Sequence, residues 1–325
     1  MKKYKKIFSI FIACLTTASA FSFHMSADVS YKVSSDDSRY KYIINDNGSI
    51  SIAANENSSS KLNGQVTLPS SLDGRTVTGI CEKGFANNEN ITMVNIPDTV
   101  KEINSLAFAN CLSLSSVSIP DTITSMGTIP FSCSIYEEKL INMADDGFVT
   151  INDYILYLYT GKNKDLFVPT DIKVIANSAF ANNGGYSSED FEITSVTIPD
   201  NIEYIGDDAF YNCKGLSSAI IGTGVKEIGN NAFANCSVTI YGYNGTYAQK
   251  YSQNNNLTFI LLISNPNESK YEIEYDENFK KYYFSTDTSF SKEGLKVYKR
   301  FYDGSRTEVT DWEFASTPDK LYAQS

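Results

Sequence analysis

VNIPDTVKEINSLAFANC, from Val94 to Cys111, recurs along this chain in close variants. An alternating V-x-I segment, a proline-aspartate pair, spaced aliphatic residues and Ala-Phe all return from Val196. The copy from Val117 keeps the first three features, the copy from Ala219 keeps the last two, and weaker copies begin at Val66 and Phe167. One motif phenylalanine marks each copy: Phe85, Phe108, Phe131, Phe180, Phe210 and Phe233. In adjacent copies these phenylalanines lie 23 residues apart. Self-similarity at one fixed period predicts a solenoid of stacked coils.

Two longer steps between motif phenylalanines locate insertions. Phe131 and Phe180 lie 49 residues apart, two periods plus three, so one coil between them has lost its signature. Phe180 and Phe210 lie 30 residues apart, and the surplus seven fit a loop at 184–190. Insertions confined to one place per coil mark a loop face.

Within one coil, the V-x-I segment alternates as a half-buried strand does, with Val94 and Ile96 inward and Met93 and Asn95 outward, and Pro97 ends the pairing. The remaining inward positions are Val100, Ile103, Ala107, Phe108 and Leu114. The apolar side chains of one coil are too few to offset the conformational entropy lost when the coil is ordered. Each coil must therefore share strand hydrogen bonds and an apolar core with its neighbours. We therefore expect a mainly β protein with modified ends.

The pattern V-x-I-P-D-x-I-x-x-I-x-x-x-A-F-x-x-C resembles the BspA-type bacterial leucine-rich repeat over roughly residues 40–262. The resemblance implies an N-terminal cap at 40–69, a short helix at 246–254 in the closing element, and a hairpin at DGFVTINDYILYLYTG that interrupts the repeat. We predict the capped solenoid at residues 28–262, with the hairpin insertion at about 134–165. The family implies surface exposure and binding to proteins, cells or glycans, and leaves the ligand open.

The chain begins with a basic segment followed by an apolar run from residue 7 to about 23, as a secretory signal does. Cleavage fits after Ala20 or after Ala27, and we assign the signal peptide to residues 1–27. An uncleaved anchor or lipidation at Cys14 are the alternatives. Because no second long apolar stretch follows, no membrane span is expected after cleavage.

Charge and histidine content exclude several functions. The formal net charge of −11 would repel a phosphate backbone, which argues against nucleic acid as a partner. The only histidine, His24, lies in or beside the signal. A mature chain starting at Asp28 therefore lacks the residue needed for a Ser-His-Asp triad, a Cys-His pair or a histidine metal site. We predict a non-enzymatic protein with no catalytic residue, no metal and no cofactor.

The cysteines predict packing rather than chemistry. Five follow the signal, an odd number that cannot all pair within the chain: Cys81, Cys111, Cys133, Cys213 and Cys236. Cys111, Cys213 and Cys236 each stand three residues after a motif phenylalanine, which predicts a ladder of small buried thiols. A disulfide between the last two, in adjacent coils, is the alternative.

Acidic pairs lack metal-ligand spacing. Asp207 and Asp208 occupy a variable slot of the repeat and fit solvated surface, while Asp145 and Asp146, before the hairpin, keep calcium binding as an alternative.

We predict that the outward side of the strand ladder binds the ligand, because side chains at strand spacing can engage a flat partner through many modest contacts. The alternative is an ordinary solvated sheet face. The candidate ligand-binding residues are Met93, Asn95, Ser116, Ser118, Ser195, Thr197, Ser218 and Ile220.

After Leu262 the repeat stops and a second unit begins. LKVYKRFYDGSRTEVTDWEF, from Leu295, has two alternating runs around Asp303 and Gly304, which predict a β-hairpin. The segment resembles a bacterial immunoglobulin-like domain without its last strand. We predict a partial immunoglobulin-like β-sandwich at residues 263–325, cut short, with the natural chain continuing beyond Ser325.

These observations predict a secreted or cell-surface binding and adhesion protein whose solenoid engages an extracellular protein or glycan. Cell-wall association would come through sequence beyond Ser325. Two alternatives stay open: the non-catalytic targeting region of a larger exported hydrolase, and a structural spacer.

Overall fold

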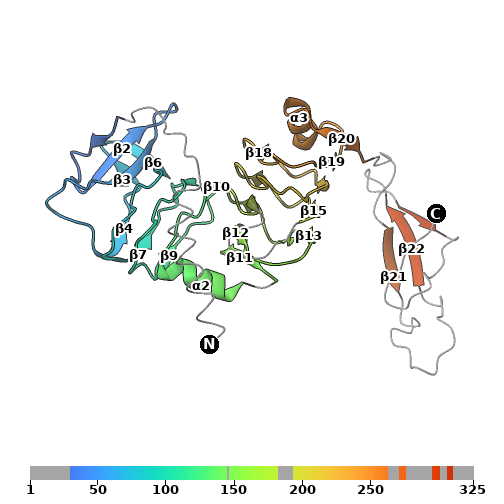
Figure 1. The fold of residues 1–325 in the computed structure, drawn as a ribbon, viewed down its shortest axis with the longest axis horizontal. Coiled ribbons are helices and arrows are strands. Elements are labelled where there is room, and N and C mark those ends of the chain that lie inside the picture. The colour runs from blue at the N-terminus through green and yellow to red at the C-terminus, as the bar shows by residue number, and fades with distance from the viewer. Residues whose placement is uncertain are drawn as a thin grey trace, which may run out of the picture. The chain divides into compact units, whose positions relative to one another are not determined.

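The computed structural model describes residues 30–144, 146–181, 193–262, 271–275, 295–300 and 306–309. The predicted signal peptide and the predicted loop at 184–190 lie outside these residues. The chain forms two compact units, Met1–Leu261 and Leu262–Ser325. The first is a mainly β solenoid of about nine turns of about 23 residues. Its coils lie side by side from β2 and β3 at one end to β19, β20 and α3 at the other (Figure 1).

The V-x-I segments form two separate parallel sheets. The first, here called the N-terminal ladder, contains β4 (Gly64–Thr67), β7 (Ile91–Asn95) and β9 (Ser116–Ser118). The second, the C-terminal ladder, contains β13 (Asp165–Phe167), β15 (Ser195–Ile198), β17 (Ser218–Ile221), β19 (Thr239–Gly242) and β20 (Thr258–Leu261). Inward residues of these strands are buried and outward residues are exposed or half-buried, as the alternation predicts.

Short second strands form two further ladders. One holds β6 (Arg75–Ile80), β8 (Glu102–Ile103) and β10 (Ser125–Met126), and the other holds β14 (Val174–Ile175), β16 (Tyr204–Ile205) and β18 (Glu227–Ile228). In the segment 40–69, where the N-terminal cap was predicted, β2 (Tyr40–Ile44) and β3 (Ile50–Ala54) form an antiparallel hairpin, which β1 (Lys32–Val33) flanks. β3 pairs with β6, which β5 (Ser71–Leu72) also joins. The predicted closing helix is α3 (Tyr247–Asn254).

A column of aromatic rings runs through the core. The six motif phenylalanines are at most 1% exposed, and where their coils are adjacent the rings stack with centroids 4.6 to 5.7 Å apart. Tyr157 and Tyr159 fill the gap between Phe131 and Phe180, at 6.2 and 5.5 Å from these rings. Tyr40 and Tyr251 close the column edge-on at its two ends.

Left-handed residues flank the motif phenylalanines on both sides, except that the second residue after Phe180 lies outside the described residues. The backbone φ lies between 36° and 62° two residues before the ring (Lys83, Leu106, Ile129, Ser178, Asp208, Asn231) and two residues after it (Asn87, Asn110, Cys133, Asn212, Asn235). Asparagine tolerates this conformation better than most residues with a side chain. The asparagine in Ala-Phe-x-Asn is therefore a turn requirement, repeated because every coil makes the same turn.

The predicted ladder of thiols is confirmed. Cys81, Cys111, Cys213 and Cys236 are free cysteines. The thiols of Cys111, Cys213 and Cys236 each donate to the carbonyl oxygen of the motif phenylalanine in the preceding coil, at 3.2, 3.1 and 3.0 Å. A thiol is small enough for this position and also satisfies a buried carbonyl group.

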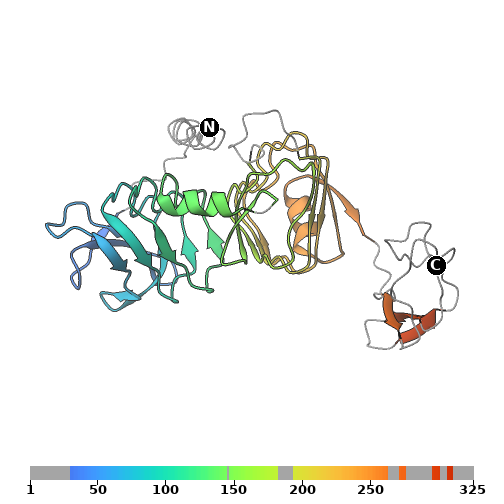
Figure 2. The same ribbon diagram turned by 90° about the horizontal axis from the view of Figure 1, so that it is seen from below.

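The coil that lost its signature is replaced by a helix and the predicted hairpin. The hairpin, β11 (Phe148–Ile151) with β12 (Ile155–Tyr159), is confirmed, and β12 pairs with β14. Helix α2 (Ile135–Met143) was not predicted. Its N-terminus is capped by Ser134, whose hydroxyl accepts from the backbone N–H of Glu137 at 3.1 Å. Figure 2 shows α2 along the flank of the coil stack.

The second unit contains one three-stranded antiparallel sheet of β21 (Tyr271–Tyr275), β22 (Leu295–Arg300) and β23 (Arg306–Val309). The predicted hairpin around Asp303 and Gly304 is confirmed by the pairing of β22 with β23. Within the described strands of this unit there is no second sheet, so an immunoglobulin-like sandwich is not established. Among the described residues no helix has the length and apolar character to cross a bilayer.

Candidate functional site

The eight predicted binding residues lie on the outward sides of the two ladders. Across neighbouring strands, Met93 pairs with Ser116 and Asn95 with Ser118. In the C-terminal ladder, the corresponding pairs are Ser195 with Ser218 and Thr197 with Ile220. All eight are exposed or half-buried. They do not form one continuous face, because α2 and the β11–β12 hairpin come between β9 and β13 and the two ladders are separate sheets.

The outward side of the C-terminal ladder carries an apolar row, which we call the C-terminal row. Strand register aligns Phe167, Thr197, Ile220, Tyr241 and Ile260 across five strands. Phe167, Ile220 and Ile260 are 58%, 40% and 44% exposed. Sequence reasoning found only Thr197 and Ile220. Extending the register of Ile220 into the weaker repeats would have found the other three.

A polar row lies two residues earlier in the same strands. Register aligns Asp165, Ser195, Ser218, Thr239 and Thr258. The Asp165 carboxylate accepts from the hydroxyls of Ser195, at 2.7 Å, and Thr194, at 2.9 Å. These hydrogen bonds, that from Ser195 foremost, lower the pKa of Asp165, so this end of the row is anionic at neutral pH.

The N-terminal ladder has a different outward side. Gln65, Met93 and Ser116 form one row, and Thr67, Asn95 and Ser118 form the other. The Asn95 side chain donates to the hydroxyl of Thr67 at 3.2 Å. Met93 is the only large apolar side chain in the two rows, and it is half-buried.

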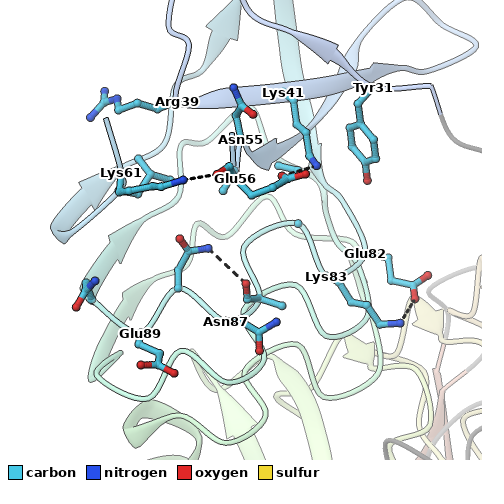
Figure 3. A pocket seen from close by; sticks show the side chains of 17 residues that line it. Tyr31, Arg39, Lys41, Asn55, Glu56, Lys61, Glu82, Lys83, Asn87 and Glu89 are labelled. Carbon is cyan, nitrogen blue, oxygen red and sulfur yellow. Dashed lines mark hydrogen bonds and ion pairs between the residues drawn. The ribbon is translucent and has the colours of Figure 1, made fainter. Parts of the chain in front are cut away.

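A polar pocket of about 670 Å³ lies between the N-terminal cap and the first coil (Figure 3). Four cationic side chains line it, Arg39, Lys41, Lys61 and Lys83, together with the acids Glu56, Glu82 and Glu89, the amides Asn55, Asn87, Asn88 and Asn90, and Tyr31. Lys41 forms an ion pair with Glu56 at 2.6 Å and lies 4.6 Å from the centre of the Tyr31 ring. The pocket offers hydrogen-bond donors, acceptors and one partly exposed aromatic ring.

A groove of about 800 Å³ lies where the two ladders are separated. Helix α2, strand β11 and the segment beginning at β13 supply its walls. The apolar lining residues are Tyr136, Leu140, Met143, Ala144, Phe148, Phe167 and Pro169, and the charged ones are Lys139, Asp146, Asp153 and Asp171. Sequence reasoning missed this groove, since its residues come from segments with no shared local pattern.

The described part of the chain contains no group of three histidine, cysteine, aspartate or glutamate side chains that could hold a metal ion.

The paired acids Asp207 and Asp208 are half-buried rather than fully solvated, contrary to prediction. The Asp207 carboxylate accepts from the backbone N–H of Asn230 at 2.6 Å. Desolvation, reinforced by neighbouring Asp207, raises the pKa of Asp208.

Residues 51–187 and 184–293 match the family described as the BspA type leucine rich repeat region, in six copies. The chain belongs to this family. No curated protein matches this BspA-type protein.

Several solved structures of bacterial proteins are similar to this BspA-type chain. One is the leucine-rich repeat protein TpLRR of T. pallidum, with 20% identity over 61% of this chain and 87% of that chain and a TM-score of 0.33. Another is a leucine-rich cell surface protein of Faecalibacterium prausnitzii A2-165, with 17% identity over 70% and 98% and a TM-score of 0.23. A third is the pneumococcal vaccine antigen PcpA, with 12% identity over 72% and 99% and a TM-score of 0.24.

Proposed function

We propose that this BspA-type repeat protein is exported and acts at the cell surface, where its solenoid binds an extracellular protein. The observation that carries the proposal is the C-terminal row. Phe167, Ile220 and Ile260 are 58%, 40% and 44% exposed on the first, third and fifth strands of the ladder, and the half-buried Thr197 and Tyr241 lie between them. Exposed large apolar side chains gathered on one face mark interaction sites in soluble proteins. At a strand spacing of about 4.8 Å, the five aligned residues extend about 19 Å.

The polar row beside it suits the rim of such an interface. Its hydroxyls and the Asp165 carboxylate lie beside the apolar side chains on the same strands, so a partner could bury the apolar row and hydrogen-bond to its polar neighbour. Four of the eight predicted residues, Ser195, Thr197, Ser218 and Ile220, lie in the two rows of the proposed face. The N-terminal four would add polar contacts for a larger partner.

The test uses the full mature chain from Asp28 on an array of extracellular proteins. Ile220→Arg with Tyr241→Arg places two charged side chains in the apolar row, and this variant should bind every array partner at least tenfold more weakly. The matched control combines Lys101→Ala, Glu102→Ala and Glu227→Ala, which alters exposed charges outside the N-terminal ladder and the C-terminal ladder. It should leave the affinity within about threefold of the wild-type value. If the control variant loses binding while the arginine variant keeps it, the binding site lies on another face. An array without any partner would favour a structural spacer.

A glycan is the second candidate ligand, favoured by the pocket in Figure 3. Its volume of about 670 Å³ suits a small ligand, and its amides and charged groups match the hydroxyls of a sugar. Tyr31 is 37% exposed and could stack on a sugar ring. Binding on a glycan array that Tyr31→Ala abolishes, and that Ile220→Arg with Tyr241→Arg leaves unchanged, would support this candidate over the protein ligand.

Export and display complete the proposal. The basic-then-apolar start supports a signal peptide at residues 1–27, ahead of a solenoid at 28–262. The segment at 263–325 would then hold the solenoid away from the cell, as an immunoglobulin-like spacer. Mass spectrometry of the protein from culture medium and cell wall tests this, since a mature N-terminus at Phe21 or Asp28 is expected. An uncleaved N-terminus would overturn the signal assignment. A catalytic domain after Ser325 would instead favour the targeting region of an exported hydrolase.

A further inference from the structure

The groove between the two ladders has walls that are fixed before any partner arrives. Tyr136 of α2 packs edge-on against Phe131, with ring centroids 5.2 Å apart. Phe148 of β11 packs against Tyr159 at 5.0 Å. Both partners belong to the aromatic column of the core, so the groove needs little reorganisation to accept a ligand.

Exposed apolar side chains line this preformed groove. Met143 is 80% exposed and Phe167 is 58% exposed, and both lie in its lining. A flexible thioether beside an aromatic ring can adapt to side chains of different shapes. Phe167 is also the first residue of the C-terminal row, so the groove and the proposed protein-binding face are continuous.

The groove lining carries a net negative charge, with three aspartates against one lysine. Asp146, Asp153 and Asp171 line it, and within the described part of the chain none of them forms an ion pair or a side-chain hydrogen bond. The one lining cation, Lys139, donates to the backbone oxygen of Ser115 at 2.9 Å. Helix α2 ends beside these acids with no basic residue in its last turn, so its C-terminal dipole adds negative potential.

We propose that this groove binds an extended basic segment of a partner protein, in which a large apolar side chain is flanked by lysines or arginines. The inference rests on the proposed protein-binding function and specifies the chemistry of the partner. The apolar side chain would be buried against Met143 and Phe167, and the flanking cations would meet the three aspartates. Electrostatics disfavours other occupants, because a second copy of this chain, with net charge −11, or an anionic membrane would be repelled.

The probe is a fluorescein-labelled peptide, GRKGFGKRG, titrated with the full mature chain at about 50 mM NaCl and followed by anisotropy. We expect saturable binding with a Kd on the order of 10–100 μM. GEEGFGEEG should not bind over the same range, and GRKGAGKRG should bind at least fivefold more weakly. Absence of binding by GRKGFGKRG, or equal binding by the acidic peptide, would overturn the inference.

The decisive variant combines Asp146→Asn, Asp153→Asn and Asp171→Asn. It should bind GRKGFGKRG at least tenfold more weakly than the wild type does. It should also lose the dependence of the affinity on salt between about 50 and 300 mM NaCl. Its matched control, Asp46→Asn, Asp98→Asn and Glu227→Gln, removes the same charge at exposed acids outside the groove and should change affinity less than twofold. If both triple variants bind the peptide equally weakly, the effect comes from the net charge of the protein alone, and the groove is not the binding site.

Failure of the groove and failure of the proposed function can be told apart. If array partners bind and depend on Ile220 and Tyr241 while the peptide is indifferent to the aspartate triple, the groove inference falls and the function stands. If the peptide depends on the aspartates while the array yields no protein partner, the groove stands and the function falls.

Discussion

The two halves of the solenoid have the same core and different surfaces. Phe85, Phe108 and Phe131 stack in the first half as Phe180, Phe210 and Phe233 do in the second. Outward, the N-terminal ladder carries mainly polar side chains, whereas the C-terminal ladder carries an exposed apolar row. The period constrains the residues that face inward and those that make the left-handed turns. Function in such a repeat is therefore found where the outward residues depart from their counterparts in other coils.

The core phenylalanines should contribute equally in both halves. Phe108→Ala and Phe210→Ala should each lower the free energy of unfolding by about 3–5 kcal/mol, because each leaves a cavity between two stacked rings. Urea denaturation of the two variants measures this. A loss below about 1 kcal/mol in either would contradict the shared register, and a large difference between them would show that the halves are not equivalent.

Glu137 makes the dividing helix α2 sensitive to pH. Its buried carboxyl accepts from the Tyr157 hydroxyl at 2.6 Å and from the Cys133 backbone N–H at 3.0 Å, but burial dominates and raises its pKa above 4.5. A raised folded-state pKa gives stability that is present below pH 4.5 and lost as pH rises through the folded-state pKa.

Glu137→Gln should therefore gain on the wild type as pH rises from 4.5, by up to about 1.4 kcal/mol per pH unit until the wild-type carboxyl is ionised. Denaturation of both proteins between about pH 4 and pH 8 measures this. Glu138→Gln is the matched control, since Glu138 is exposed on the same helix. A pH-independent difference between Glu137→Gln and the wild type would show that burial leaves this carboxyl's pKa unshifted.

The two ends of the aromatic column should respond oppositely to loss of a hydroxyl. The Tyr251 hydroxyl accepts from the backbone N–H of Phe233 at 3.3 Å, whereas the buried Tyr40 hydroxyl has no hydrogen-bond partner among the residues that the structure describes. Tyr251→Phe should cost about 1–2 kcal/mol, and Tyr40→Phe should be neutral or stabilising by up to about 1 kcal/mol. Thermal melts of the two variants test this. Destabilisation by Tyr40→Phe would mean that its hydroxyl has a partner in solution.

The thiol ladder should behave alike in both halves, with almost no effect of reductant. Burial raises the pKa of Cys111 to about 11, so its thiol is protonated and unreactive at neutral pH. We expect Cys111 and Cys213 to react with a thiol reagent only after unfolding, and the melting temperature to change by less than about 1 °C on reduction. A disulfide between Cys213 and Cys236 in the purified protein would contradict the ladder.

The sequence predicts the fold correctly wherever a repeated or local pattern of residues encodes the structure. The period, the inward residues, the cap, the hairpin and the closing helix were all predicted, because each coil restates the same pattern and each end has its own short motif. Helix α2 was missed although Ser134 and Glu137 form the S-x-x-E spacing of a helix start. The prediction of a hairpin insertion at about 134–165 covers these residues but includes no helix.

The candidate site was less predictable, because it depends on register and on contacts between distant segments. Ile220 was found from a strong repeat, but Phe167 lies in a weak one, and Ile260 belongs to a last strand outside the consensus. The groove brings Tyr136, Asp153 and Asp171 together across the interruption. No local pattern encodes that proximity.

The hydrogen bonds along the aromatic column have a direction, and this affects how the gene can change. The backbone N–H groups of Phe85, Phe108, Phe180 and Phe210 each donate to a carbonyl of the following coil, while Phe233 donates to the closing Tyr251. Each interior coil therefore presents the same donors and acceptors above and below. Duplication or deletion of a whole 23-residue unit between Phe85 and Phe131 would leave both ends matched, and the 30-residue step from Phe180 to Phe210, which keeps the same hydrogen bond, shows that a longer coil is also accepted. Recombination between repeats can thus lengthen or shorten the binding surface in whole coils while the caps stay unchanged.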